Sequence, residues 1–111
     1  MTDDDATTDD DGDKAYASLI EQACRAVRAH QLTEAERLAR EALAHDPERA
    51  AAYNVLAVVR ELAGHHPEAM DLLRAGLAVE PSYPPAQYNL AHLAVWPRRA
   101  GFRLGDGDED E

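Results

Sequence analysis

Hydrophobic side chains recur at helical spacing along most of the chain. Between residues 33 and 45, Ala35, Leu38, Ala39, Ala42 and Leu43 follow one another at intervals that place them on one face of a helix. No stretch alternates polar and apolar residues with an enrichment of β-branched side chains, so the pattern gives no support for strands. The sequence therefore predicts an all-α protein.

Prolines and a glycine divide this helical pattern. Pro47 and Pro81 are each expected to end a helix, because the residue before a proline is pushed out of the helical region. Pro67 suits the first turn of a helix, where its missing N–H costs nothing. Gly64, just before it, suits the end of the preceding helix.

A capping-box pattern marks the start of one helix. Thr33 can accept a hydrogen bond from the backbone N–H of Glu36, whose carboxylate can reach back to the backbone of Thr33. Together with the prolines, this predicts five helices, over about 15–29, 33–45, 48–63, 67–79 and 84–96. Only a few residues separate consecutive helices, so neighbours are expected to pack antiparallel.

The chain repeats itself at an offset of 34 residues. Residues 32–47 (LTEAERLAREALAHDP) and 66–81 (HPEAMDLLRAGLAVEP) are identical at seven of sixteen positions. The last predicted helix continues the repeat, because Leu56 and Ala57 recur as Leu90 and Ala91. A helix-turn-helix unit with this period resembles the tetratricopeptide repeat (TPR).

The resemblance to the TPR family is most complete over residues 50–83, which carry an aromatic, a leucine–alanine pair, a turn glycine, an alanine and a terminal proline at its characteristic positions. These residues are Tyr53, Leu56, Ala57, Gly64, Ala69 and Pro81. Residues 16–49 match less well, with Gln22 where leucine is usual, and the third unit has only its first helix. The resemblance implies antiparallel helix-turn-helix repeats, two TPR units plus one terminal helix, stacked as a short right-handed solenoid.

The formal net charge of −11 is concentrated at the two ends of the chain. Residues 1–13 hold seven Asp and residues 106–111 hold five acids, whereas the ten acids in between face eleven Lys and Arg. Like-charge runs are typical of solvated tails. We expect a disordered acidic tail over 1–14, a helical repeat domain over 15–97 and a disordered tail over 98–111, acidic at its end. The alternative is a tail that attracts a basic partner or the chain's own arginines.

Several classes of partner and location are disfavoured by composition. The chain has no basic patch, so no nucleic-acid partner is expected. The N-terminus is acidic, unlike a signal peptide, and the longest aliphatic run, 55–59, is too short to span a bilayer. We expect a cytoplasmic protein with no membrane partner.

Catalytic and metal chemistry also find little support. His65 and His66 are adjacent at a predicted turn, so they do not form a metal-binding pair on one helix face. A nucleophile–base pair of Cys24 and His92 would lack an orienting acid. The sequence predicts no enzyme, no cofactor and no metal site.

The resemblance implies a concave groove lined by the first helix of each repeat, and hence a non-catalytic scaffold that binds a partner's peptide or helix. The expected lining, mainly apolar, is Ile20, Cys24, Val27, Asn54, Val58, Glu61, Tyr88, Asn89 and His92. Relatives that hold the acidic C-terminus of heat-shock chaperones use a basic and amide clamp. Here the matching positions are Ile20, Cys24, Val55, Pro85 and Asn89, of which only Asn89 is polar, so that ligand is disfavoured. Alternatively, several aliphatic lining residues belong to the core between helices.

The terminal helix suggests a second function, self-association. Between Pro81 and Pro97 there is no Asp, Glu, Lys or Arg. An apolar terminal face of this kind is typical of an interface, and a homodimer is the alternative function. The interface candidates are Leu93, Val95, Trp96 and Phe102. The opposing possibility is that Trp96, Pro97 and Phe102 fold back and cover this face.

Overall fold

The computed structural model describes residues 2–95 and 102–105, with side chains for residues 11–94 and 102–105. Its helices are α1 (Thr2–Arg28), α2 (Leu32–His45), α3 (Ala50–Leu62), α4 (His66–Val79) and α5 (Pro84–Val95), and these residues contain no strand. The all-α prediction is confirmed. The bounds of α2 to α5 lie within two residues of those predicted, because prolines and turn residues mark them in the sequence.

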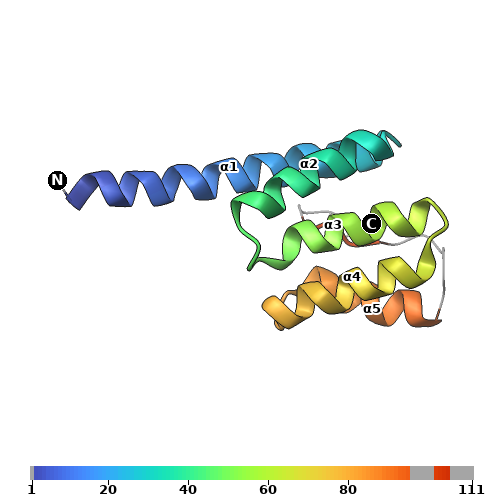
Figure 1. Ribbon diagram of the computed structural model, residues 1–111. Helices are drawn as coiled ribbons and strands as arrows, with labels where there is room; N and C mark the ends of the chain where they lie inside the picture. The colour runs from blue at the N-terminus through green and yellow to red at the C-terminus, as the bar shows by residue number, and fades with distance from the viewer. Residues whose placement is uncertain (1, 96–101, 106–111) are drawn as a thin grey trace.

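The helices stack as successive antiparallel pairs, α1 with α2 and α3 with α4, followed by the single helix α5 (Figure 1). The first helices of the units, α1, α3 and α5, contact one another in that order, and α2 and α4 pack against them. This arrangement confirms the predicted helical repeat solenoid. It also places α1, α3 and α5 together on the face where the groove was expected.

The first helix differs from the prediction, because α1 begins at Thr2, within the segment expected to be a tail. Acidic side chains are favourable near a helix N-terminus, where the dipole is positive. One of these acids, Asp13, lies 3.7 Å from a guanidinium nitrogen of Arg49, so the end of the acidic segment contacts the repeat domain.

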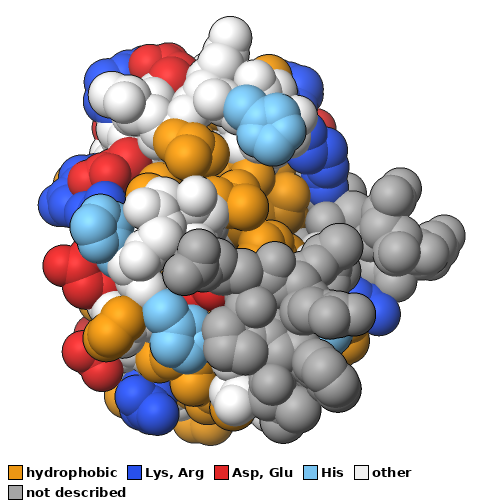
Figure 2. Space-filling view, turned by 90° about the vertical axis from the view of Figure 1, so that its right-hand side faces the viewer, with side chains coloured by type: hydrophobic (Ala, Val, Ile, Leu, Met, Phe, Trp, Pro, Cys, Tyr) orange, Lys and Arg blue, Asp and Glu red, His pale blue; other side chains and the backbone are white. Residues whose placement is uncertain are grey.

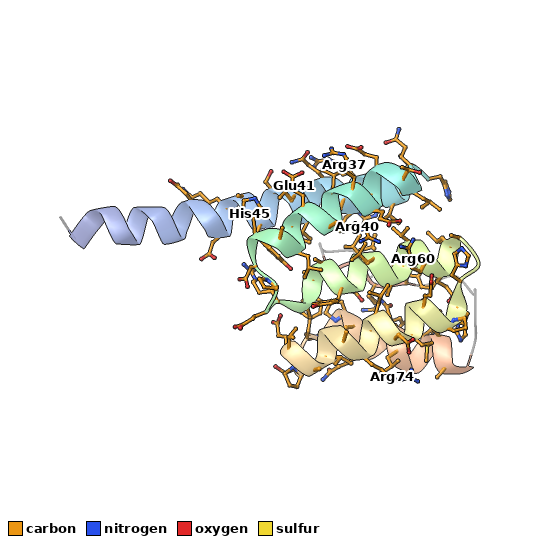
Figure 3. All side chains as sticks on the ribbon, in the orientation of Figure 1. Arg37, Arg40, Glu41, His45, Arg60 and Arg74 are labelled. Atoms are coloured by element: carbon orange, nitrogen blue, oxygen red, sulfur yellow. The ribbon has the colours of Figure 1, made fainter. Side chains whose placement is uncertain are left out.

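The capping-box prediction was wrong. The N-cap residue of α2 is Gln31, and no described side chain caps this end. Glu36 instead accepts hydrogen bonds from Arg60 of α3, at 2.8 and 3.0 Å, and from Arg40, at 2.8 Å. Figure 3 shows Arg40 and Arg60 in the region between α2 and α3. The hydrogen bonds from Arg60 hold the pKa of Glu36 below its usual range, and they join the two repeats.

The turns inside the two repeats have the same geometry. His30 follows α1 with φ 60°, and Gly64 follows α3 with φ 89°, at the same position of the repeat. In each turn the next residue donates a backbone hydrogen bond, 2.8 Å long, to the carbonyl five residues back. This left-handed conformation costs glycine little and other residues more. Gly64 therefore suits its turn, whereas His30 carries a backbone cost.

The start of α3 is held by side chains from two other segments. The backbone N–H of Ala52 donates to the Tyr16 hydroxyl of α1 at 3.0 Å, and that of Ala50 donates to a Glu80 carboxylate oxygen at 2.8 Å. These groups satisfy N–H donors that a helix leaves free in its first turn. Tyr16 is only 1% exposed, and burial raises the pKa of its hydroxyl. The inner helix α3 is therefore fixed in position relative to α1.

Candidate peptide-binding groove

Residues 102–105 lie against the inner face of the solenoid, far along the sequence from the helices they touch. Figure 1 shows this short stretch in red passing α3. Leu104 is 4% exposed and belongs to the same buried cluster as Ile20 and Cys24 of α1. The segment is not helical, and it contacts residues of α1, α3 and α5. The face that was expected to bind a peptide is therefore occupied by the chain's own residues.

Two asparagine side chains hold the backbone of this segment. Asn89 of α5 accepts from the backbone N–H of Arg103 at 2.7 Å and donates to its carbonyl at 2.7 Å. Asn54 of α3 donates to the same carbonyl at 2.8 Å. Asn89 also donates to the Asn54 side-chain oxygen at 2.8 Å, which fixes the two amides relative to each other. Because both side chains are 0% exposed and bonded to each other, they form a fixed site for the backbone N–H and carbonyl of one residue.

The side chain of Arg103 lies over an aromatic ring of the inner face. Its guanidinium carbon is 4.2 Å from the centre of the Tyr88 ring, within the range of a cation–π interaction. On the same helix, the rings of Tyr88 and His92 are stacked, with centres 5.3 Å apart. The guanidinium therefore lies over the Tyr88 ring, which itself stacks on His92.

The hydrophobic neighbours of Arg103 are partly or fully buried. Phe102 packs against both buried clusters of the protein, and Leu104 lies inside one of them. The Cys24 thiol donates to the Leu104 carbonyl, with a distance of 3.7 Å between sulfur and oxygen. Cys24, with no exposed surface, is therefore a small packed residue beneath the segment.

The described part of the segment ends at a glycine whose backbone conformation disfavours larger residues. Gly105 has φ 88°, and a Cβ added there would collide with the Tyr83 hydroxyl. Next to it an open cavity of about 600 Å³ continues along the inner face, lined among others by Tyr16, Ile20 and Arg49. The inner face therefore extends beyond the described part of the segment.

The residues proposed from the sequence to line the groove fall into two groups. Cys24, Asn54, Tyr88 and Asn89 contact residues 102–105 directly. The others have different surroundings: Ile20, Val27 and Val58 are buried in the same cluster as Leu104, His92 stacks on Tyr88, and Glu61 is buried. The surroundings of the three aliphatic residues agree with the alternative, left open by the sequence, that they belong to the core between helices. Their role in binding stays a prediction.

Glu61 of α3 is a buried carboxylate with a single described partner. One of its oxygens lies 2.8 Å from Nδ1 of His66, and the other has no hydrogen-bond partner among the described residues. This pair lies beside the turn between α3 and α4, at that end of the helices. Figure 2 looks onto that end, where hydrophobic side chains gather between histidines and charged groups.

Of the interface residues proposed from the sequence for the terminal helix, Leu93 lies inside the protein. Leu93 is 0% exposed and packs in a cluster with Ala57 and Leu73, so it is not available to another chain, and Phe102 is half-buried. Trp96 and the side chain of Val95 lie outside the described residues. The expectation of an apolar face waiting for a partner is therefore wrong for Leu93. Phe102 packs against the same cluster, in line with the opposing possibility that it folds back onto this face.

Sequence reasoning missed Arg103, Leu104 and Gly105 as residues of this site. The available signal was the pair of apolar residues, Phe102 and Leu104, just before a run of acids. Of residues 102–105, only Phe102 is among the residues that the sequence suggested could fold back. The hydrogen bonds to Arg103 are made by its backbone, so its side chain gives no sequence signal for them.

Two further features are absent from the described residues. They contain no group of three His, Cys, Asp or Glu side chains placed to hold a metal ion. None of the helices in these ranges is long and apolar enough to cross a membrane.

Comparison with known proteins agrees with the repeat geometry. The sequence pattern of the tetratricopeptide repeat matches residues 26–93. No curated protein and no solved structure shows a significant match. TPR domains are generally non-enzymatic modules that mediate protein–protein interaction. With a match that spans more than half of the chain and a structure of stacked helix pairs, this protein belongs to the tetratricopeptide repeat family.

Proposed function

We propose that this protein is a non-catalytic interaction module that binds a non-helical peptide of a partner protein on its inner face. The observation that carries the proposal is the contact between residues 102–105 and the helices. There, Asn54 and Asn89 make three hydrogen bonds to the N–H and carbonyl of a single residue. Backbone hydrogen bonds of this kind provide affinity for a peptide, and neighbouring side-chain contacts provide selectivity.

The inner face supports a peptide better than a helix. A helix uses its interior N–H and carbonyl groups in its own hydrogen bonds, so it cannot offer both groups of one such residue to Asn89. A non-helical peptide leaves them free. The site also gives no support for a clamp that binds a carboxylate. The two asparagines are neutral, and their amides bind a peptide backbone.

The experiment is a selection of seven-residue peptides from a displayed library. The target is the full chain with Leu104→Asp. This change replaces a buried leucine by a charge, so it is expected to release residues 102–105 and free the inner face. Selected peptides should bind this variant and lose at least roughly fivefold in affinity when Asn89→Ala is added, since a hydrogen bond contributes about 0.5–1.5 kcal/mol and two are removed. Arg74→Ala, an exposed change on the outer helix α4 (Figure 3), is the matched control.

The proposal would be contradicted by either of two outcomes. One is that no peptide is enriched although the variant keeps the helicity of the wild type. The other is that enriched peptides bind equally well with Asn89→Ala, which would place them away from the inner face.

A further inference from the structure

We propose that residues 102–105 are an intramolecular ligand, and that the partner peptide carries the same pattern: a hydrophobic residue, an arginine, an aliphatic residue and a glycine. This inference rests on the proposed function, because it names the peptide that the inner face binds. It adds that the chain's own segment competes with the partner for the site.

The backbone contacts define the conformation of the ligand. Asn89 bonds both the N–H and the carbonyl of Arg103, at 2.7 Å each. The two groups of one residue point to the same side only when the chain is extended, as in a strand that pairs along one edge. The site therefore takes an extended peptide, and it holds one defined residue of that peptide at Asn89.

The side-chain contacts define which residue is held there. The guanidinium of Arg103 lies 4.2 Å from the Tyr88 ring centre, and Tyr88 is backed by His92. Arginine suits this surface better than lysine, because its planar group stacks on a ring while it stays charged. The central residue of the partner's segment is therefore expected to be arginine.

The flanking residues complete the pattern. Leu104 fits into a buried cluster and is only 4% exposed, so the position after the arginine takes an aliphatic side chain. Phe102 packs on both clusters, which favours a large hydrophobic residue before the arginine. Gly105 has φ 88°, and a Cβ there would require the Tyr83 hydroxyl to shift, so glycine is favoured at the next position. Together these contacts make the site selective for the side chains at four consecutive positions of a peptide.

A partner peptide can displace residues 102–105 from the site, so their role is not limited to stabilising the fold. Only six residues, 96–101, connect it to α5, so it meets the site at a high effective concentration, of the order of millimolar for a short tether. A competing peptide then binds with an affinity reduced by the fraction of molecules whose site is free, about 10- to 100-fold if that fraction is 1–10%. The cavity of about 600 Å³ beyond Gly105 offers a longer partner peptide additional contacts.

The test uses a labelled peptide with the chain's own sequence over 100–107, AGFRLGDG. It is titrated by fluorescence anisotropy into the full chain and into the full chain carrying Leu104→Asp. We expect the variant to bind at least tenfold more tightly than the wild type. A peptide in which serine replaces the arginine should bind the variant at least tenfold more weakly. If Leu104→Asp lowers the helicity, Arg103→Ser, which leaves the buried leucine in place, is used as the releasing change.

Cys24 provides an independent readout, because it is the only cysteine of the chain and lies beneath Leu104. Its reaction with a disulfide reagent should be slow in the wild type and at least tenfold faster in the releasing variant. Saturating peptide should slow the reaction of the variant again.

Each outcome separates this inference from the proposed function. Equal peptide affinity of wild type and releasing variant would overturn the intramolecular ligand. Equal binding of the peptide without arginine would overturn the pattern. If the library instead yields unrelated peptides whose binding depends on Asn89, the proposed function stands and this inference fails. If no peptide of any sequence binds in that way, both fail.

Discussion

Replacing Tyr16 by phenylalanine removes one hydroxyl that links the first repeat to the second. The ring, 1% exposed, can stay where it is, so the change isolates the hydrogen bond from the backbone N–H of Ala52, 3.0 Å long. A second contact, from the hydroxyl to the Arg49 carbonyl, is 3.5 Å long and adds little.

The expected cost follows from what is left behind. The Ala52 N–H remains buried in the first turn of α3 without its acceptor, and an unsatisfied buried donor costs about 1–3 kcal/mol. Because some of this is recovered by local relaxation, we expect Tyr16→Phe to lower the free energy of unfolding by roughly 1–2 kcal/mol. For a domain of this size that corresponds to a decrease in Tm of roughly 5–10 °C.

The same change should alter the dependence of stability on pH. Burial raises the pKa of Tyr16 above 10.0, so the folded state holds this proton more tightly than the unfolded state. The stability due to this group is complete below pH 10 and is lost as pH rises from there through the folded-state pKa. In Tyr16→Phe this contribution to the alkaline loss of stability should be absent.

The assay is urea denaturation followed by circular dichroism, at neutral pH and at several values above 9. Tyr53→Phe is the matched control, because the half-buried Tyr53 makes no hydrogen bond through its hydroxyl within the described part of the chain. Its effect should stay below about 0.5 kcal/mol. A Tyr16→Phe protein as stable as the wild type, with the same alkaline profile, would refute the idea that this hydroxyl anchors α3.

Three further predictions concern the repeats. His30→Gly should stabilise the protein by about 0.5–1 kcal/mol, since it relieves a positive φ, whereas Gly64→Ala should destabilise it by a similar amount or more; thermal unfolding checks both, and a less stable His30→Gly protein would contradict the reasoning. Leu38→Ala should cost about 2–4 kcal/mol because Leu38 is 5% exposed, and Leu72→Ala less because Leu72 is only half-buried, so equal costs in urea denaturation would count against this account. Glu36→Gln should flatten the loss of stability below about pH 4.5, because the lowered pKa of Glu36 contributes stability that is present above pH 4.5 and lost as pH falls; an unchanged acid profile would show that its bond to α3 contributes nothing.

The helices could be predicted from the sequence because their limits are marked locally. Pro47 and Pro81 end helices without reference to the rest of the fold, and the 34-residue period reports how the pairs stack. The capping pattern of Thr33 and Glu36 failed because a residue of another helix, Arg60, offers the glutamate better partners. Tertiary contacts of this kind leave no trace in a short window of sequence.

The occupied inner face could be predicted only in part. Asn54 and Asn89 were identified from their place in the repeat, and they do meet at 2.8 Å. Their ligand was not identified, because Arg103 lies in the short sequence between Pro97 and a run of acids, which resembles a solvated tail in composition. The two asparagines bind the backbone N–H and carbonyl of Arg103, a pair of groups that every residue other than proline possesses. The sequence therefore does not show which residue they bind.

The most direct test of the account is hydrogen exchange of the Arg103 backbone amide, measured by NMR on the full chain. The N–H is bonded to Asn89 at 2.7 Å, so we predict that it exchanges at least roughly tenfold more slowly than the same amide in a free peptide. Asn89→Ala should remove this protection while amides inside α3 keep theirs. An Arg103 amide that exchanges at the free-peptide rate in the wild-type protein would contradict the claim that the inner face binds this segment.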